Sequence, residues 1–462
     1  MTPMRRNSLF VLLLTAAVAI GGCQTVNRFN PFSRDDEPQE VASEGERIAI
    51  VADGQQLEVS EALQGADFFL PTPTPMSEWP VPGGNLEQAV GHAEGGGNLS
   101  VVWRRDFGQG SKGGHHVTAP PVAAGGKIFV MDGEARVSAF DAQSGSQVWS
   151  VNLKPDGRRD REAFGGGLAV AGGKLYVSSG YRFMAQLDAN TGAVGWRTNT
   201  EQPLHAAPTV SGGRAFVVAI DNTLLTFDTA TGEAGWTYQA LTEPARILKA
   251  SSPAVSGDTV VASFGSGELV ALRAANGNDL WSEALSQASR SNALSEIRDI
   301  PGRPAIYQGD VFAVSHSGVF SATDLRTGQP RWSLPVTGIT TPWPAGDVVY
   351  VVSKSGEVIC AARESGQIYW IRDLGEGRES RRGRFFGLGT RHFSVRPIWS
   401  SPLLVSNRLL VAGSTGELVV LNPKTGAVER TINLGAPTLI GPIAAGGTVY
   451  VVTDQAQLIA LR

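Results

Sequence analysis

Short apolar segments recur along the chain from residue 99 onward, and Gly-rich turns separate them. KLYVSS (174–179), ELVALR (268–273) and VVYVVS (348–353) are examples in which apolar, β-branched and aromatic side chains predominate. Runs of this length that are bounded by turn residues are typical of β-strands. We therefore predict an all-β fold built from many short strands.

One ten-residue phrase, of which LDANTGAVGW (187–196) is an example, is repeated along the chain. In every copy a Gly follows Ser, Thr or Asn at the same place, and the phrase usually ends in Trp. Such a glycine suits the position of positive φ that a short hairpin loop requires. We expect Asp141, Asp188 and Asp228 to cap these turns rather than to form a catalytic carboxylate set, because they recur with the repeat. The copies span 140–149, 187–196, 227–236, 272–281, 323–332, 361–370 and 421–430.

The tryptophan at the end of the phrase indicates how the repeats associate. A four-stranded sheet cannot bury both of its faces alone, so neighbouring sheets must stack on it. A Trp in that joint buries roughly 200 Å², and at about 25 cal/mol per Å² its burial stabilises each junction by several kcal/mol. We expect these side chains to be structural and not to form an aromatic ligand cage. They are Trp149, Trp196, Trp236, Trp281, Trp332 and Trp370.

Four short strands repeated at roughly 40–50 residues predict a β-propeller. The phrase supplies seven fourth strands, and an eighth unit begins at Gly441 but ends at Arg462 before its fourth strand. LSVVW (99–103) is an unpaired strand with a Trp at the other end of the repeat region. We predict an eight-bladed propeller of four-stranded blades, closed by 99–103 in the last blade; seven blades with one degenerate unit is the alternative.

The first 22 residues have the pattern of an export signal. Arg5 and Arg6 precede an apolar stretch, Leu9 to Ile20, that is too short to span a bilayer. The small residues before Cys23 resemble a bacterial lipobox, which implies cleavage before Cys23 and lipidation of that residue. The residue directly after this cysteine is Gln24 and not Asp, which by the usual lipoprotein sorting rule implies transport to the outer membrane. A plain signal peptide with a chance cysteine is the alternative.

Residues 23–98 differ in composition from the repeat region. They contain DDEPQE (35–40) and PTPTP (71–75), which favour a Pro-stiffened tether. Two apolar stretches, ERIAIVA (46–52) and EWPVPGGN (78–85), are expected to dock on the folded domain. We therefore divide the chain into a signal peptide (1–22), a lipidated and partly docked tether (23–98) and a propeller (99–462).

Composition and motifs argue against several classes of function. The net charge of −4 gives no electrostatic footprint for nucleic acid. Cys360 has no partner once Cys23 carries lipid, and its apolar surroundings predict a buried, inert thiol. The histidines lack metal-ligand spacing, and neither a P-loop nor G-x-S-x-G occurs. We expect no catalytic residue, no cofactor and no metal.

Three insertions lengthen the repeat and are the best candidates for binding loops. The stretches 241–250 and 283–302 flank the same repeat unit, so we expect them to lie together. The third, 375–398, contains Arg378, Arg381, Arg382, Arg384 and Arg391 beside Phe385 and Phe386. It suits an acidic partner or a headgroup, and a solvated surface loop is the alternative.

The repeat resembles the pyrroloquinoline-quinone-type propeller repeat, whose dehydrogenases use a vicinal cysteine pair, a calcium ion and a catalytic aspartate. This chain has no Cys-Cys, so a quinone-dependent dehydrogenase is a minor alternative. The lipobox, the tether, the repeat and the segment 295–332 (SEIRDIPGRPAIYQGDVFAVSHSGVFSATDLRTGQPRW) together resemble the BamB family. These are lipoproteins of the outer-membrane β-barrel assembly (BAM) machinery.

The resemblance implies a non-enzymatic scaffold that binds the periplasmic POTRA domains of BamA through two neighbouring loops. The family's Leu-x-Leu-Arg pattern corresponds to Arg246-Ile247-Leu248-Lys249, where Leu248 and Lys249 match and Arg246 departs from the pattern. Leu248 is then an apolar anchor, and Lys249 helps to set the register of the contact.

The family's second pattern, Asp-x-Asp, corresponds to Asp299-Ile300-Pro301. Asp299 matches it, whereas Pro301 lacks the second carboxylate, so Arg298 or Glu296 would supply part of the charged contact. Ile300 is expected as the second apolar anchor.

The function implied is therefore that of a lipid-anchored protein on the periplasmic face of the outer membrane. It would hold the POTRA domains of BamA while outer-membrane proteins fold and insert, and it would contact unfolded outer-membrane proteins as a second class of partner. A propeller that binds another periplasmic partner or ligand remains the alternative.

Overall fold

The computed structural model describes residues 57–155, 163–243, 247, 251–286, 297–376, 382–384, 390–392 and 396–462. The chain divides into two compact units, Met1–Gln55 and Gln56–Arg462, and all described residues lie in the second. This boundary is earlier in the chain than residue 99, where the composition changes. No helix long and apolar enough to cross a membrane occurs among the described residues.

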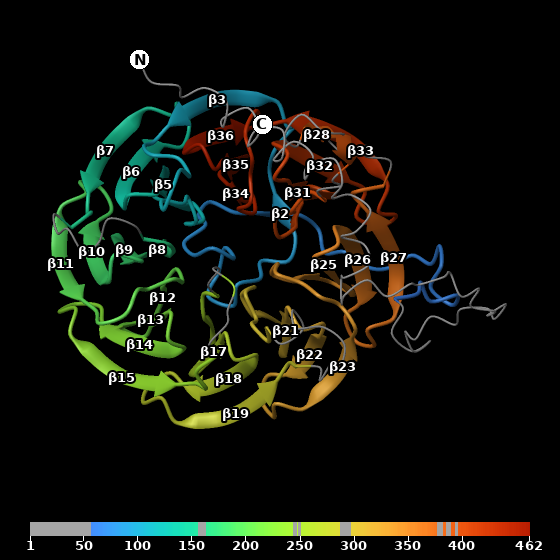
Figure 1. The fold of residues 1–462 in the computed structure, drawn as a ribbon, viewed down its shortest axis with the longest axis horizontal. Coiled ribbons are helices and arrows are strands. Elements are labelled where there is room, and N and C mark those ends of the chain that lie inside the picture. The colour runs from blue at the N-terminus through green and yellow to red at the C-terminus, as the bar shows by residue number, and fades with distance from the viewer. Residues whose placement is uncertain are drawn as a thin grey trace, which may run out of the picture. The chain divides into compact units, whose positions relative to one another are not determined.

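Eight sheets with four antiparallel strands each are arranged as the blades of a β-propeller (Figure 1). The predicted all-β fold with eight four-stranded sheets is confirmed. Blades 1 to 4 contain β4 (Val122–Ala124), β5 (Lys127–Met131), β6 (Arg136–Asp141) and β7 (Gln147–Asn152); β8 (Gly166–Ala171), β9 (Lys174–Ser179), β10 (Phe183–Asp188) and β11 (Val194–Asn199); β12 (Thr209–Ser211), β13 (Arg214–Val218), β14 (Thr223–Asp228) and β15 (Ala234–Gln239); and β16 (Ala254–Ser256), β17 (Thr259–Ser263), β18 (Glu268–Arg273) and β19 (Asp279–Ala284).

The second half of the ring repeats the same order. Blades 5 to 7 contain β20 (Ala305–Tyr307), β21 (Asp310–Val314), β22 (Phe320–Asp324) and β23 (Pro330–Leu334); β24 (Trp343–Ala345), β25 (Val348–Val352), β26 (Glu357–Ala362) and β27 (Ile368–Asp373); and β30 (Leu403–Val405), β31 (Arg408–Ala412), β32 (Glu417–Leu421) and β33 (Val428–Asn433). Blade 8 contains β34 (Ile443–Ala445), β35 (Thr448–Val452), β36 (Gln457–Leu461) and, from the other end of the repeat region, β3 (Val101–Asp106).

Strand β3 pairs antiparallel with β36, the last strand of the chain. Trp103 lies opposite Ala460, and Arg104 lies opposite Ile459. The strand covers 101–106 and is therefore shifted toward the C-terminus relative to LSVVW (99–103). Leu99 has a positive φ of 56°, which is incompatible with an extended strand at that residue.

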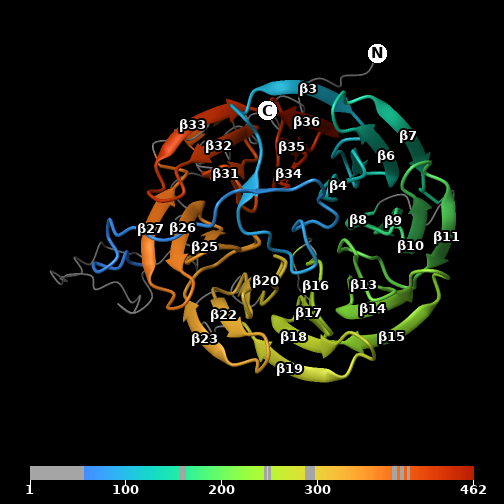
Figure 2. The same cartoon turned by 180° about the vertical axis from the view of Figure 1, so that it is seen from behind.

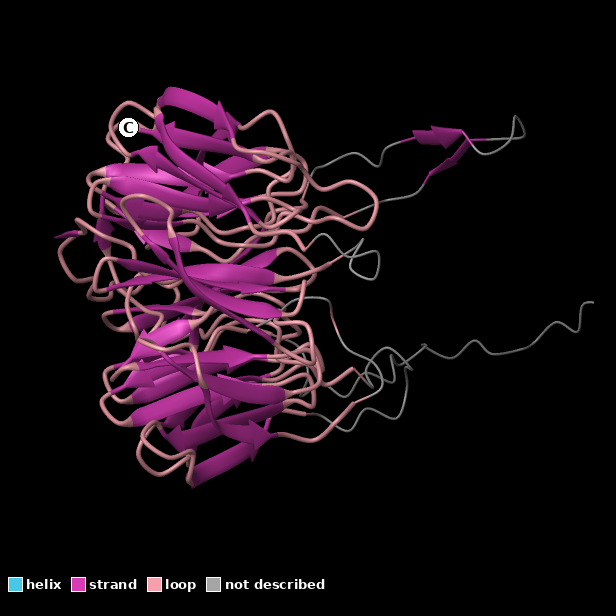
Figure 3. Cartoon of the chain, turned by 90° about the vertical axis from the view of Figure 1, so that its left-hand side faces the viewer, coloured by secondary structure: helices cyan, strands magenta, loops and turns pink. Residues whose placement is uncertain are grey.

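The meander inside each blade gives the ring two different faces. Each blade begins with its innermost strand and proceeds outward through antiparallel neighbours. The first turn of every blade and the third turn of blades 1 to 7 therefore lie on one face, which we call the turn face; it carries the seven phrase glycines. The second turns and the connections between blades lie on the opposite face, which we call the loop face. Figure 3 shows the strands edge-on, running from one face to the other.

The seven phrase glycines occupy the conformation that the sequence predicts. Their φ values lie between 67° and 76°, and a Cβ at any of them would lie 2.5–2.8 Å from the tryptophan ring of the neighbouring blade. At six of these junctions the ring Nε1 also donates to a carbonyl of that blade, whereas the Nε1 of Trp103, which packs on Gly145, has no hydrogen-bond partner among the described residues. The donor–acceptor pairs are Trp149–Ala189, Trp196–Thr229, Trp236–Ala274, Trp281–Leu325, Trp332–Arg363 and Trp370–Pro423.

The recurring aspartates cap the phrase turns. Asp141 Oδ1 accepts the Ser144 amide at 2.8 Å, and Asp228 Oδ1 accepts the Thr231 amide at 2.9 Å. These hydrogen bonds hold the pKa of both carboxyls below their ordinary value. The structural interpretation of these residues is thus confirmed.

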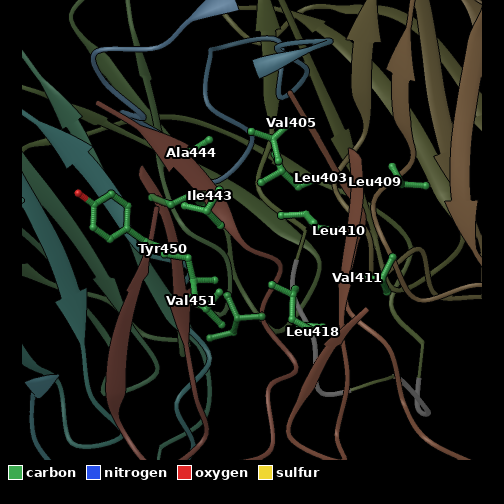
Figure 4. Close-up of a cluster of buried hydrophobic side chains, with 14 of the residues drawn as sticks. Leu403, Val405, Leu409, Leu410, Val411, Leu418, Ile443, Ala444, Tyr450 and Val451 are labelled. Atoms are coloured by element: carbon green, nitrogen blue, oxygen red, sulfur yellow. The ribbon is translucent and has the colours of Figure 1, made fainter. Parts of the chain in front are cut away.

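Apolar side chains fill the space between neighbouring blades. Figure 4 shows part of this core around blades 7 and 8, where Leu403, Leu410, Val451 and Tyr450 are buried. Cys360 is also fully buried, and burial raises the pKa of its thiol well above the ordinary value. The predicted buried thiol is confirmed.

Residues 68–98, which we call the lid segment, cross the turn face at the centre of the ring (Figure 2). EWPVPGGN (78–85) lies within it, and its Trp79 is fully buried. Two short strands, β1 (Thr74–Pro75) and β2 (Ala93–Glu94), extend the sheet of blade 7. ERIAIVA (46–52) lies outside the described residues.

The lid segment forms hydrogen bonds with all eight blades. They join, in order of blade, Trp79 with Ala123, Pro80 with Val170, Gln88 with Thr209, Leu86 with Val255, Glu87 with Ile306, Gly91 with Trp343, Ala93 with Ser406, and Met76 with Gly446. A stretch that looks like a tether in the sequence is therefore part of the folded ring.

Candidate functional site

The loop face carries all three insertions. They connect the outer strand of one blade with the inner strand of the next: β15 with β16, β19 with β20, and β27 with β30. Within the third insertion, β28 (Arg382–Arg384) pairs antiparallel with β29 (Thr390–His392). The side chains of Arg378, Arg381, Arg382, Arg384, Arg391, Phe385 and Phe386 lie outside the described part of the chain.

Asp299 joins the first two insertions. Its side-chain Oδ2 accepts a hydrogen bond from the Ile247 amide at 2.8 Å, and its carbonyl accepts the His316 amide at 2.8 Å. The residue is only 3% exposed. The predicted proximity of the two loops is confirmed, and the carboxylate of Asp299 bridges them at Ile247.

The other residues implied by the family resemblance fall into two groups. Arg298 is exposed next to Asp299. Ile300 is 1% exposed and belongs to the core cluster that contains Leu285 and Ile306, which differs from the exposed apolar anchor that the resemblance implies. The residues that lie outside the described part of the chain are Arg246, Leu248, Lys249, Glu296 and the lipidation candidate Cys23.

A cavity of about 300 Å³ lies at the centre of the loop face. Seven blades line it with the residue that directly precedes the proline just before the inner strand. In six of these blades the residue is Pro, Ala, Ser, Thr or Gly, and in blade 5 it is Arg303. The residues are Pro120, Ala207, Ser252, Arg303, Thr341, Ser401 and Gly441.

The remaining wall of the cavity is mostly apolar. Phe164 lies between the rings of His116 and His205, with centroid distances of 5.4 and 5.5 Å. Trp399 and Ile440 contribute further apolar surface. The two insertions also reach this cavity, because Ile247 and Pro301 are among its lining residues.

Two ionisable groups on the cavity wall are affected by burial. Burial raises the pKa of Asp454, which the neighbouring His116 partly offsets. Burial lowers the pKa of Arg303 to about 10, so its guanidinium stays protonated at neutral pH.

Arg303 is the residue that our sequence analysis missed. The proline that precedes the inner strand in most blades marks the position, and a comparison of the residue before that proline would have shown one arginine among small residues. Among the described residues, no three His, Cys, Asp or Glu side chains converge as metal ligands.

Comparison with known proteins gives a consistent family match. A family model described as "Outer membrane protein assembly factor BamB" matches residues 93–160, 133–372 and 388–462. A protein of that name from Burkholderia pseudomallei is 25% identical over 369 residues, which cover 79% of this chain and 88% of the relative. Another, from Alkalilimnicola ehrlichii, is 29% identical over 363 residues, covering 78% and 88%.

Solved structures share the fold at lower identity. BamB from Moraxella catarrhalis superposes with a TM-score of 0.65 at 19% identity, covering 79% of this chain and 99% of that structure. A quinohemoprotein alcohol dehydrogenase from Comamonas testosteroni gives 0.63 at 14% identity, covering 83% and 80%. At these identities the similarity concerns the propeller architecture alone.

Proposed function

Because the chain belongs to the family of the outer membrane protein assembly factor BamB, we propose that it is a scaffold of the BAM machinery that binds the POTRA domains of BamA. The chain is an assembly factor and not an enzyme; the relatives that match over most of its length are named outer membrane protein assembly factors. The specific partner and the binding surface are the new elements of the proposal.

The observation that carries this proposal is the hydrogen bond between Asp299 and the Ile247 amide. It links the two insertions into one composite surface on the loop face, beside the exposed Arg298. Two loops that are fixed to each other lose less conformational entropy on binding than two independent loops.

The burial of Asp299 and Ile300 changes the roles that the resemblance implies. Asp299 acts by holding the loops together, and Ile300 acts by fastening its loop to the core of blades 4 and 5. Direct contact with BamA then falls to Leu248 as the apolar anchor and to the cations Arg246, Lys249 and Arg298, which set register against an acidic surface.

The proposal is tested by capturing the POTRA region of BamA from the same organism on the purified protein. We expect Arg298→Glu to weaken capture about tenfold, because reversing one rim charge typically costs on the order of 1–2 kcal/mol. Arg326→Glu is the matched control, since Arg326 is an exposed arginine in a phrase turn on the turn face. No capture by the folded, unaltered protein, or equal loss in both variants, would contradict the proposal.

The membrane attachment is proposed separately. Lipid on Cys23 would place the protein on the periplasmic face of the outer membrane, within reach of BamA and of unfolded outer-membrane proteins. Mass spectrometry of the mature N-terminus should find a triacylated cysteine at residue 23. Recovery of Cys23→Ser in the membrane fraction to the same extent as the unaltered protein would argue against this anchor.

We further propose that β3 closes the ring. A Cβ at Gly145 in blade 1 would lie 2.7 Å from the Trp103 ring, so Trp103 packs like the six other junction tryptophans. Deleting residues 99–106 should prevent cooperative folding. A deletion variant that unfolds at the same urea concentration as the full chain would exclude this closure.

A further inference from the structure

The guanidinium of Arg303 stands without an ionic partner on the wall of the central cavity. No ion pair or side-chain hydrogen bond joins it to any residue in the described ranges, including Asp454 on the same cavity wall. Its Nε is shielded from solvent and lacks a hydrogen-bond partner among those residues. A guanidinium can donate five hydrogen bonds, so this side chain has unused binding capacity.

An unpaired arginine at this position is unfavourable for the fold alone. Arg303 is half-buried, and shielding part of its charge from water without a partner disfavours the folded state; burial also lowers its pKa to about 10. The six other blades that contribute this repeat position use small residues or proline there, so the architecture does not require an arginine. Costly, perturbed charges in a cavity are typical of binding sites.

The backbone holds Arg303 in a defined place. Its amide donates to Thr341 Oγ1 in the next blade at 3.1 Å. A Cβ at the preceding Gly302 would lie 2.2 Å from the Thr340 carbonyl, so this close approach of two blades requires glycine. The backbone that carries the cation is therefore held in place at the cavity wall before any ligand arrives.

We propose that this cavity binds a small organic monocarboxylate, with its carboxylate on the Arg303 guanidinium and its apolar part against Phe164 and Trp399. The fork of the guanidinium matches the two oxygens of a carboxylate. Among the described lining residues Arg303 is the one arginine or lysine, and the acidic Asp454 lies on the same wall, which favours a monoanion over a doubly charged phosphate. The volume of about 300 Å³ is at the lower end of the usual range for ligand pockets, which favours a small molecule over a protein segment.

The test is ¹⁹F NMR of 4-fluorobenzoate and of its neutral analogue 4-fluorobenzamide with the purified protein. We expect saturable broadening with the acid at submillimolar to millimolar concentrations and at least tenfold weaker binding of the amide. Equal binding of the two probes, or no binding of the acid at millimolar concentration, would overturn the proposal on the unaltered protein alone.

Three variants locate the site. Arg303→Met should weaken benzoate binding at least tenfold and should unfold at the same or a higher urea concentration, because it removes an unpaired charge and keeps an apolar stem. Arg303→Lys, which keeps the charge but loses the fork, should bind with intermediate affinity. Arg326→Met on the turn face is the control and should bind like the unaltered protein.

Undiminished binding by a folded Arg303→Met would contradict the assignment, as would an equal loss in Arg326→Met. If Arg303→Met does not fold, the 4-fluorobenzoate affinity of Arg303→Lys is the deciding measurement. An affinity equal to that of the unaltered protein would contradict binding by the guanidinium fork. None of these measurements involves BamA, so their failure is distinguishable from failure of the proposed function.

Discussion

The two faces of the propeller differ in how their polar groups are satisfied. On the turn face, the lid segment hydrogen-bonds to all eight blades, and the phrase turns are capped and packed against tryptophans. On the loop face, the connections between blades are longer, and the Nε of the Arg303 side chain is left without a hydrogen-bond partner among the described residues. The contacts that stabilise the repeat therefore lie on the turn face, whereas the loop face has polar groups that remain available to bind a ligand or partner.

This difference indicates how a repeat protein acquires a function without losing its fold. Changes on the turn face disturb contacts that every blade shares, whereas the loop face tolerates insertions because they lie outside the meander. We therefore expect substitutions on the turn face to change stability with little effect on binding. Substitutions on the loop face should do the reverse.

The largest effect is expected for Trp79→Ala in the lid segment. Trp79 is fully buried and stacks on Trp343 with ring centroids 6.3 Å apart. Removing a buried Trp typically costs about 3–5 kcal/mol, so the urea midpoint should fall strongly while capture of the POTRA region by the folded fraction persists.

The control for this prediction is Phe69→Ala, because the Phe69 side chain is 62% exposed in the same segment. It should change stability by no more than about 0.5 kcal/mol. Equal destabilisation by both variants would mean that the lid segment is not fastened through the contacts of Trp79.

An intermediate effect is expected at the phrase glycines. Gly232 and Gly213 have nearly the same φ, 75° and 76°, but a Cβ would lie 2.5 Å from Trp196 at Gly232 and would meet nothing within 4 Å at Gly213. Gly213→Ala should cost about 1–2 kcal/mol for the left-handed conformation alone. Gly232→Ala should cost a further 1–3 kcal/mol or so from overpacking.

Urea unfolding of the two glycine variants measures this difference directly. Equal destabilisation would show that the conformation of the turn, and not its packing on Trp196, is what the glycine provides.

The smallest effect is expected from the titration of His92. Its Nδ1 donates to the Pro71 carbonyl at 2.6 Å and its Nε2 accepts the Asn407 amide at 2.8 Å, so both ring nitrogens are used in the neutral form. Burial lowers the pKa of this imidazole below its ordinary value. As the pH falls below about 6.5, this histidine binds a proton in the unfolded chain before it does so in the folded chain. The free energy of unfolding therefore decreases as the pH is lowered further.

His92→Gln should reduce this loss of stability, which urea unfolding at pH 7.5 and pH 5.5 would detect. An unchanged pH dependence in the variant would assign the acid sensitivity to other groups.

The repeat made most of the ring predictable. The phrase glycines and tryptophans are local patterns with a fixed chemical reason, so the eight four-stranded sheets and the capped turns follow from the sequence. The lid segment was not predictable in the same way, because its contacts with eight blades involve backbone groups that leave no periodic pattern. Trp79 was its main indication, as a large apolar residue within a Pro-rich stretch.

The candidate site was predictable in location but not in detail. Insertion length indicated the two loops, and the structure brings them together at Asp299. The burial of Ile300 was not foreseeable from a three-residue pattern, because it depends on how the loop returns to blade 5. Arg303 was visible only by comparing equivalent positions of the repeat, since nothing in its immediate sequence distinguishes it.

The central claim is that the loop face binds the partner and the turn face does not. Hydrogen–deuterium exchange of the protein with and without the POTRA region of BamA tests this most directly. We predict slower exchange in 241–250 and 297–303, with no change in the lid segment or the phrase turns. Protection confined to the lid segment or the phrase turns would contradict the account.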